Sequence, residues 1–333
     1  MAGVRPLFIS QLWKKLFRLG NRTNDSPPPA GGLHPAQRRN MKQSNQALYI
    51  SAYGQTDLGL VRKNNEDSFL IADLTGGGES HGSSAVNFAA GERGGLLMVA
   101  DGMGGAEAGE VASRMAVELV CRYVRSERFD SRQTFVASLK NSIERANVNI
   151  QQEGEKNEER KGMGTTLTAA GVFGGELIFA QVGDSRGYLV RNGSIVQMTQ
   201  DQSLVAHLVA SGVLTPEKAK VDRRRNVILQ ALGALKQVEV AVSVVELKRG
   251  DCAVLCSDGL SGKVDAEEIA GILQGSAGTD EACRQLIDLA KQRGGEDNIT
   301  VIIAKFDGEV LPLPAPDEVP TYTEIKEESH AQC

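Results

Sequence analysis

Alternating apolar and polar positions run through the middle of the chain and predict a strand-rich fold. Nine segments either alternate with a period of two or are rich in Val, Ile and Leu. They span residues 49–57, 67–73, 95–101, 166–173, 177–184, 186–193, 242–247, 252–258 and 298–306. Three longer stretches, 107–125, 133–153 and 280–293, have helical periodicity without Pro. Because the helices interrupt runs of strands in blocks, this order favours an α+β domain over a doubly wound parallel sheet, with two antiparallel sheets covered by helices.

The two ends of the chain depart from this pattern. Residues 7–19 have bulky apolar side chains at helical spacing and basic side chains opposite, which predicts a short amphipathic helix. A Pro/Gly-rich linker, 24–37, follows it. We therefore expect a basic extension over 1–47, a folded domain over 48–307 and a disordered acidic, Pro-containing tail over 308–333. Weak membrane-surface docking, partner binding and disorder all remain open for the N-terminal helix.

A Gly-rich segment inside the domain predicts a flexible loop. Residues 76–95 contain several glycines and serines, and we expect them to extend the loop of a hairpin.

Composition narrows the class of protein. With 41% hydrophobic residues in 333, the chain can bury a sizeable core. A net charge of −5 gives no electrostatic reason to bind nucleic acid. Five cysteines without a CxxC pair fit free thiols and a reducing cytoplasm. The sequence contains no apolar run of about 20 residues and no secretory signal, so we expect a cytoplasmic protein.

Candidate chemistry lies at the strand ends, where acidic residues stand beside glycines, asparagines or other acids. Rigid strand ends next to turns can bring such carboxylates into one pocket. Converging carboxylates repel one another, so the pattern implies bound cations between them. The acids concerned are Asp67, Asp101, Asp184, Asp258 and Asp297.

The kind of ligand indicates the kind of metal and reaction. The four histidines lie outside these segments, and oxygen ligands alone favour Mg²⁺ or Mn²⁺ over zinc. Two such ions can activate a bridging water for hydrolysis of a phosphate ester. Arg62 precedes Glu66 and Asp67 by four and five residues, close enough to bind the phosphate. An Asp-Gly pair alone indicates only a turn, so the prediction depends on the whole set.

The ordered segments RKNNEDSF, VADGMGGAEAGEVAS, GMGTTLTAA, AQVGDSRGYLVRNG, QDQSLV, LCSDGLSGKV and GGEDNITVIIAKF resemble the bacterial form of the type 2C, metal-dependent serine/threonine protein phosphatases. The resemblance covers residues 49–306. It implies a central β-sandwich of two antiparallel sheets flanked by helices, with a dinuclear metal centre at one end. It also implies two Mn²⁺ or Mg²⁺ ions, with a third bound more weakly.

The resemblance assigns a role to each matching residue. Arg62 would bind phosphate, Glu66 would act through water at the metals, and residues 203–228 would form a flap beside the site. The implied metal ligands are Asp67, Asp101, the Gly102 carbonyl, Asp258 and Asp297, with Asp184 and Asp258 at the third metal. The expected partners are phosphorylated proteins, targets of a serine/threonine kinase, and the expected assembly is a monomer.

Two positions depart from animal relatives of this family. Met103 stands where many of them have His, so water at the metal site must serve as the acid. Gly262 stands where they have an acid. This difference concerns the affinity for the third metal. Two alternatives stay open: a non-catalytic regulatory module on the same fold, and a phosphatase of a partner-switching pathway.

Overall fold

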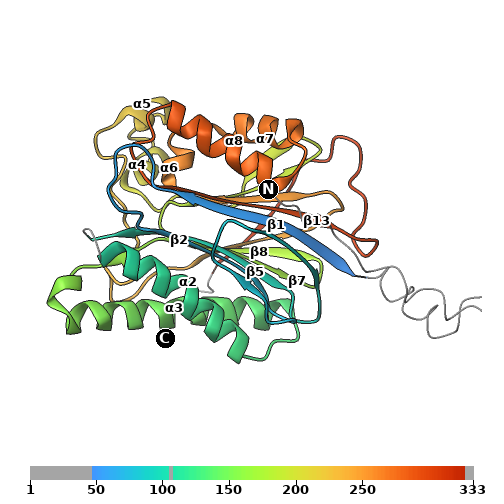
Figure 1. Ribbon diagram of the computed structural model, residues 1–333, viewed down its shortest axis with the longest axis horizontal. Helices are drawn as coiled ribbons and strands as arrows, with labels where there is room; N and C mark the ends of the chain where they lie inside the picture. The colour runs from blue at the N-terminus through green and yellow to red at the C-terminus, as the bar shows by residue number, and fades with distance from the viewer. Residues whose placement is uncertain (1–46, 105–107, 327–333) are drawn as a thin grey trace, which may run out of the picture. The chain divides into compact units, whose positions relative to one another are not determined.

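The computed structural model describes residues 47–104 and 108–326. The predicted amphipathic helix at 7–19 and its linker lie outside the described residues. Two antiparallel sheets pack face to face, and helices cover both outer faces (Figure 1). This arrangement confirms the predicted α+β architecture.

The first sheet has six strands, and all its strand pairings are antiparallel. Its order is β10 (Ser194–Gln197), β9 (Arg186–Arg191), β12 (Cys252–Cys256), β13 (Ile299–Asp307), β1 (Leu48–Asp57) and β4 (Ala85–Ala90).

The second sheet has eight strands and is also antiparallel. Its main path is β14 (Thr323–Ile325), β11 (Ala241–Glu246), β8 (Glu176–Val182), β7 (Leu167–Phe173), β5 (Gly95–Met103), β2 (Asp67–Asp73) and β3 (Glu79–Ser80). The short strand β6 (Gly164–Thr165) pairs with the end of β5.

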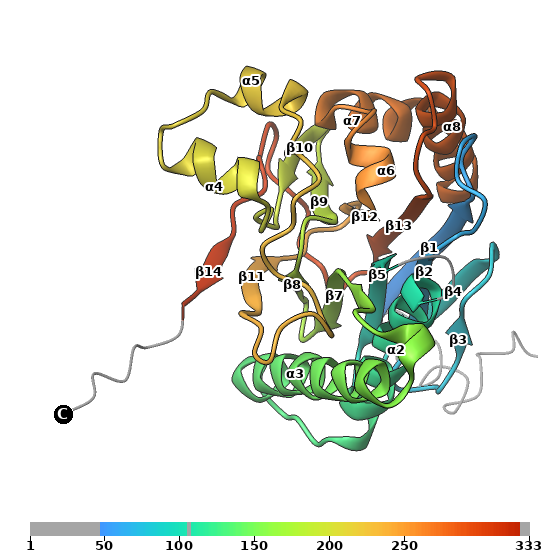
Figure 2. The ribbon, with the colours of Figure 1, turned by 90° about the vertical axis from the view of Figure 1, so that its left-hand side faces the viewer.

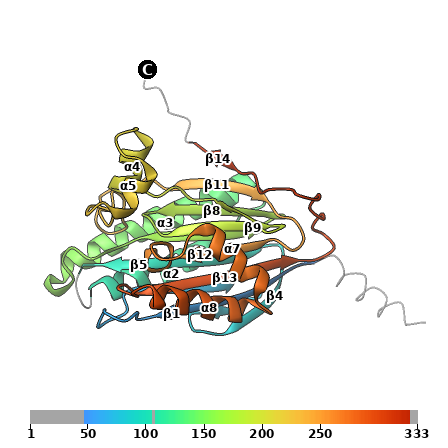
Figure 3. The same cartoon turned by 90° about the horizontal axis from the view of Figure 1, so that it is seen from above.

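Helices cover the outer faces in two groups. On the eight-stranded sheet lie α2 (Ala108–Ser126) and α3 (Arg132–Lys156), followed by the short η1 (Glu158–Arg160). On the six-stranded sheet lie α6 (Asp258–Ser261), α7 (Ala266–Gly275) and α8 (Thr279–Gln292), as Figures 2 and 3 show. Two shorter helices cover neither face. They are α4 (Leu204–Ala210) and α5 (Pro216–Val221), and they project beside one end of the sheets.

Strands in the middle of both sheets are buried on both faces. On β2, Leu70 belongs to the core under α2 and α3, whereas its neighbour Ile71 belongs to the core between the sheets. On β5, Met98 belongs to the core under the helices and Leu97 belongs to the core between the sheets. Successive side chains of a strand point to opposite faces, so each strand contributes to two cores. The sequence of these strands is therefore almost continuously apolar rather than alternating.

The Gly-rich segment 76–95 is more ordered than its composition predicts. It contains β3 and β4, and β4 pairs with β1 in the opposite sheet, with Ile50 opposite Phe88. The expectation of a flexible hairpin loop is therefore wrong for residues 85–90. The alternating Val86, Phe88 and Ala90 pack against the core between the sheets, and this burial offsets the entropy of ordering the segment.

The acidic tail is also ordered through residue 326. Leu311 is buried at 2% exposure, Asn192 Nδ2 donates to the Ala315 carbonyl at 2.9 Å, and β14 pairs with β11. The expectation of disorder is therefore wrong for residues 308–326, whereas 327–333 lie outside the described residues. Proline prevents a helix here, but an extended segment can still satisfy its hydrogen bonds against the domain.

Across the same described ranges, no helix combines the length and the apolar character needed to cross a bilayer.

Candidate active site

Four of the five predicted acids meet because of how antiparallel strands pair. Asp67 begins β2 and Asp101 lies near the end of β5, and these two residues are direct partners in the ladder. Asp258 follows the end of β12, and Asp297 precedes the start of the adjacent β13. In an antiparallel pair, the start of one strand lies beside the end of its neighbour. Each sheet therefore delivers two carboxylates to the same end of the sandwich.

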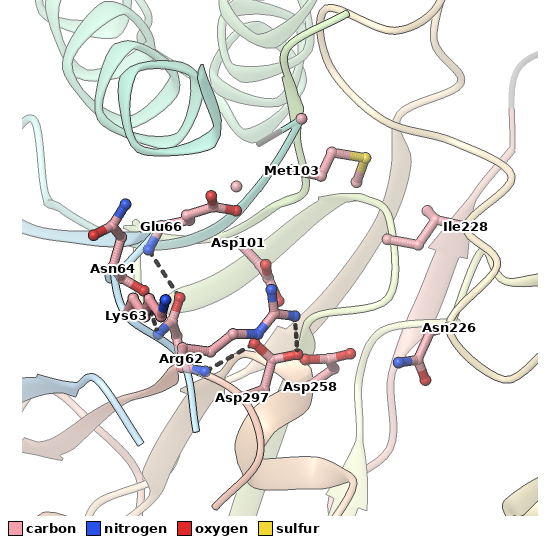
Figure 4. Close-up of a pocket in the computed structure, with 13 residues that line it drawn as sticks. Arg62, Lys63, Asn64, Glu66, Asp101, Met103, Asn226, Ile228, Asp258 and Asp297 are labelled. Carbon is pink, nitrogen blue, oxygen red and sulfur yellow. Dashed lines mark hydrogen bonds and ion pairs between the residues drawn. The ribbon is translucent and has the colours of Figure 1, made fainter. Parts of the chain in front are cut away.

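A cavity of about 500 Å³ opens between these strand ends. The sequence-predicted residues on its walls are Arg62, Glu66, Asp101, Gly102, Asp258 and Asp297 (Figure 4). Asp67 and Asp184 lie behind this wall, 6% and 7% exposed. Asp184 comes from the connection between β8 and β9, where the chain passes from one sheet to the other.

Two hydroxyl groups hold Asp67 in place. Its Oδ2 accepts hydrogen bonds from Ser257 Oγ and Thr300 Oγ1, both at 2.7 Å. Its other oxygen, Oδ1, is buried and has no hydrogen-bond partner among the described residues. The hydroxyls orient the carboxylate and leave one oxygen aimed at a ligand that protein groups do not supply.

Close backbone packing shapes the wall around Glu66. The Gly102 amide donates to the Glu66 carbonyl at 3.1 Å. A Cβ on Gly102 would overlap the carbonyl oxygens of Glu66 and Gly109, and a Cβ on Gly109 would lie 2.7 Å from Glu66 Oε2. Both positions therefore need glycine, because the loop before β2, the end of β5 and the start of α2 meet there.

Asn298 ties the Arg62 loop to β13. Its Nδ2 donates to the carbonyls of Leu58 and Asn64, each at 3.0 Å, and its Oδ1 accepts from the Glu66 amide at 2.8 Å. This single side chain, 4% exposed, bonds both ends of the loop that presents Arg62. Sequence reasoning placed Asn298 in a strand and missed this role. The only signal was its position beside Asp297.

Arg62 is the cation facing the acids. Its Nη2 donates to Asp297 Oδ2 at 2.8 Å, and the side chain remains 49% exposed (Figure 4). The hydrogen bond to Asp297 raises the pKa of Arg62 above its ordinary value. With five N–H donors on a planar guanidinium, Arg62 can bind Asp297 and still present donors to the cavity.

Burial and mutual repulsion raise the pKa values of four aspartates, Asp67, Asp101, Asp184 and Asp258. Burial, with added repulsion from Asp258, raises the pKa of Asp67 to about 7 and that of Asp184 to about 7. Burial, then repulsion from Asp67, raises the pKa of Asp101 well above its ordinary range. Burial, followed by repulsion from Asp297, raises the pKa of Asp258. The protein alone therefore does not neutralise this cluster.

The donor set fits hard divalent cations. Asp67 Oδ1, Asp184 Oδ1 and Asp258 Oδ1 are buried without a hydrogen-bond partner in the described part of the chain. Carboxylate and carbonyl oxygens are the ligands that Mg²⁺ and Mn²⁺ prefer. Within 47–104 and 108–326, no three His, Cys, Asp or Glu side chains are already close enough to hold an ion between them.

The predicted flap region lies beside the cavity. It contains α4 and α5, neither of which has a buried residue. Its base is held by backbone hydrogen bonds from Leu204 to Val227 and from Leu229 to Gln202, each 2.8 Å. Asn226 and Ile228 from this base line the cavity, and sequence reasoning had not singled them out. The basic residues 223–225 do not belong to the cavity wall.

The structure shows where Met103 and Gly262 lie, the two positions that depart from animal relatives. Met103 lines the cavity. Gly262 ends α6, where its amide donates to the Asp258 carbonyl at 2.7 Å. Gly262 thus stabilises the short helix that begins with Asp258 and adds no carboxylate beside that residue.

Comparison with known proteins identifies the family. The protein phosphatase 2C family model matches residues 84–294. The serine/threonine phosphatase stp of Listeria monocytogenes is 37% identical over 254 residues, which are 76% of this chain and 94% of that protein. The serine/threonine protein phosphatase PstP of Mycobacterium tuberculosis is 38% identical over 257 residues, 77% of this chain and 45% of that longer protein.

Solved structures agree with the fold. A serine/threonine phosphatase of S. agalactiae superposes with a TM-score of 0.69 at 35% identity, covering 78% of this chain and all of that one. The PstP catalytic domain in complex with two manganese ions gives 0.65 at 36% identity, covering 78% and 99%. The chain therefore belongs to the bacterial branch of the protein phosphatase 2C family and is a protein-serine/threonine phosphatase.

Proposed function

We propose that this phosphatase hydrolyses phosphoserine and phosphothreonine with two Mn²⁺ or Mg²⁺ ions held at the strand-end acids. The proposed ligands are Asp67, Asp101, the Gly102 carbonyl, Asp258 and Asp297, with Asp184 and Asp258 at a third, weaker site. The observation that carries the proposal is the meeting of Asp101, Asp258 and Asp297 at one cavity wall, with Asp67 and Asp184 buried behind it. Asp67, Asp184 and Asp258 each have a buried oxygen without a hydrogen-bond partner among the described residues. Two ions in such a site supply an activated water and neutralise the charge on the phosphoryl oxygens.

The chain's own groups orient the substrate. Arg62 lies at the cavity wall with donors directed to the open space, which suits bidentate binding of phosphoryl oxygens. Burial raises the pKa of Glu66, so its carboxylate holds a proton more readily than an exposed one and can orient a water. Met103 has no proton to give, so the leaving oxygen must take its proton from water.

The proposed substrates are targets of a serine/threonine kinase. The proposed location of the phosphatase is the cytoplasm. The support is the family itself and a cavity open to solvent at its mouth, where Arg62 and Lys63 are exposed. Hydrolysis of a phosphothreonine peptide with Mn²⁺, Mg²⁺ or EDTA tests the proposal. Metal-dependent turnover supports it. A folded chain without metal-dependent turnover on any phosphopeptide would favour a regulatory module.

Replacing Arg62 by Ala should lower kcat/KM for the peptide by about 10²- to 10³-fold, because two charged hydrogen bonds to the phosphate are lost. Arg62→Lys should recover only part of this activity, since an ammonium cannot make the paired contacts. Arg284→Ala is the matched control, because that arginine forms an exposed pair with Asp280 on α8. Equal activities for Arg62→Ala and Arg284→Ala would contradict the role.

The metal-free protein should lose stability as pH rises. Asp67 and Asp184 have a pKa of about 7 in the folded protein, against about 3.9 for an unfolded Asp. Between these values the folded state binds more protons than the unfolded state, so the free energy of unfolding falls with increasing pH. Mn²⁺ should therefore raise Tm more at pH 8 than at pH 5.5.

Thermal melts with Mn²⁺ or EDTA at both pH values, at matched ionic strength, measure this difference. An effect of Mn²⁺ that is equal at both pH values would contradict the metal assignment.

A further inference from the structure

The loop that carries Arg62 also exposes two large apolar side chains, at the two positions directly before this cavity-lining residue. Leu60 is 62% exposed and Val61 is 65% exposed, and Val61 directly precedes Arg62. Neither belongs to a buried core cluster. Nothing in the hydrolysis of the phosphate itself uses them.

This loop is held rigidly, although its tip faces solvent. The Leu60 amide donates to the Gly295 carbonyl at 2.7 Å, and the Gly59 amide donates to Asp57 Oδ1 at 2.9 Å. Gly59 has a φ of +78°, and a Cβ there would overlap the Asp297 carbonyl oxygen. Asn298 fixes the loop again on either side of Leu60, at Leu58 and Asn64. A rigid loop binds a partner with little loss of conformational entropy.

The base of the flap contributes one apolar side chain, Ile228, and one polar side chain, Asn226, to the cavity wall. Ile228, from the base of the flap, lines the cavity across from Arg62 (Figure 4). The flanking Val227 and Leu229 are 45% and 44% exposed. Exposed apolar side chains thus stand next to the cavity-lining Arg62 and Ile228, in two segments far apart in sequence.

We propose that Leu60 and Val61 determine substrate specificity by contacting an apolar side chain next to the phosphorylated residue of the substrate protein. The occupant is a substrate segment because the exposed Val61 is the direct neighbour of the residue proposed to bind its phosphate. A phosphoryl group on Arg62 brings the neighbouring residues of its own chain close to the loop that carries Arg62. The inference rests on the proposed role of Arg62.

Three substrates separate this role from catalysis in the full-length protein with Mn²⁺. They are p-nitrophenyl phosphate, a phosphothreonine peptide flanked by Leu, and the same peptide flanked by Ser. Wild type should prefer the Leu-flanked peptide. Val61→Ser should raise KM for that peptide by about 5- to 30-fold, the effect of losing one buried apolar contact. Its kcat/KM for p-nitrophenyl phosphate and for the Ser-flanked peptide should not change.

The matched control is Val310→Ser. Val310 is 48% exposed and lies by the turn where Arg249 Nε donates to the Gly308 carbonyl, at the end of β12 and β13 opposite to Asp258 and Asp297. A second comparison uses Leu60→Ser, with Leu313→Ser as its control. Leu313 is 69% exposed and lies in the C-terminal segment.

Two results would overturn the inference. The first is that Val61→Ser and Val310→Ser give the same KM for the Leu-flanked peptide. The second is that Val61→Ser slows p-nitrophenyl phosphate equally, which would place Val61 in the general machinery. A wild type inactive on all three substrates would instead overturn the proposed function on which the inference rests.

Discussion

Replacing Asp101 or Asp258 by Asn should lower kcat/KM for a phosphothreonine peptide by about three orders of magnitude or more. Each substitution keeps the size of the side chain and removes a negative charge that faces the proposed metals. Calorimetry should show that both variants bind Mn²⁺ more weakly than the wild type does. Asp288→Asn is the matched control, because Asp288 is an exposed residue of α8 far from the strand ends.

The same two variants should be more stable than wild type when both are metal-free at pH 8. Burial and repulsion raise the pKa values of both aspartates, so an uncharged amide relieves an unfavourable charge. A higher Tm in EDTA together with lost activity would separate this mechanism from misfolding. Unchanged turnover or unchanged Mn²⁺ affinity in Asp258→Asn would refute the metal assignment.

Replacing Arg191 by Met should cost about 3–5 kcal/mol of unfolding free energy, because it leaves a buried carboxylate without its partner. Arg191 binds Asp251 through Nε at 2.9 Å and Nη2 at 2.7 Å, and both side chains are almost fully buried, 4% and 0% exposed. Arg191 Nη1 also binds Glu318 at 2.8 Å, which attaches the C-terminal segment to the domain.

Urea denaturation of the metal-saturated protein measures this cost. Arg132→Met is the control, because Arg132 binds Glu176 at 2.8 Å but remains 48% exposed, and such surface pairs contribute at most about 1 kcal/mol. Equal costs for the two variants would show that burial of the Arg191 pair does not matter. Glu318→Gln should have a smaller effect than Arg191→Met, since Asp251 keeps its partner.

Much of the fold could be predicted because its signals are local. The three long helices follow from apolar spacing within about 15 to 25 residues, and α2, α3 and α8 begin and end within three residues of the predictions. The acids of the candidate site could be recognised because each stands at the end of a recognisable strand. Short elements such as α7, with only ten residues, lacked enough turns to be distinguished from loop.

The tertiary structure decided what each local signal was paired with. Asp67 is recognisable in sequence, but its partners Ser257 and Thr300 are 190 and 233 residues away. Glu318 lies in a segment with the composition of a disordered tail, yet it reaches Arg191 across 127 residues. By itself the sequence determined the long helices, most of the longer strands, the candidate acids and the family they resemble. Only the packing of the two sheets decided which hydroxyls, amides and arginines face them, because such contacts join residues that no local pattern connects.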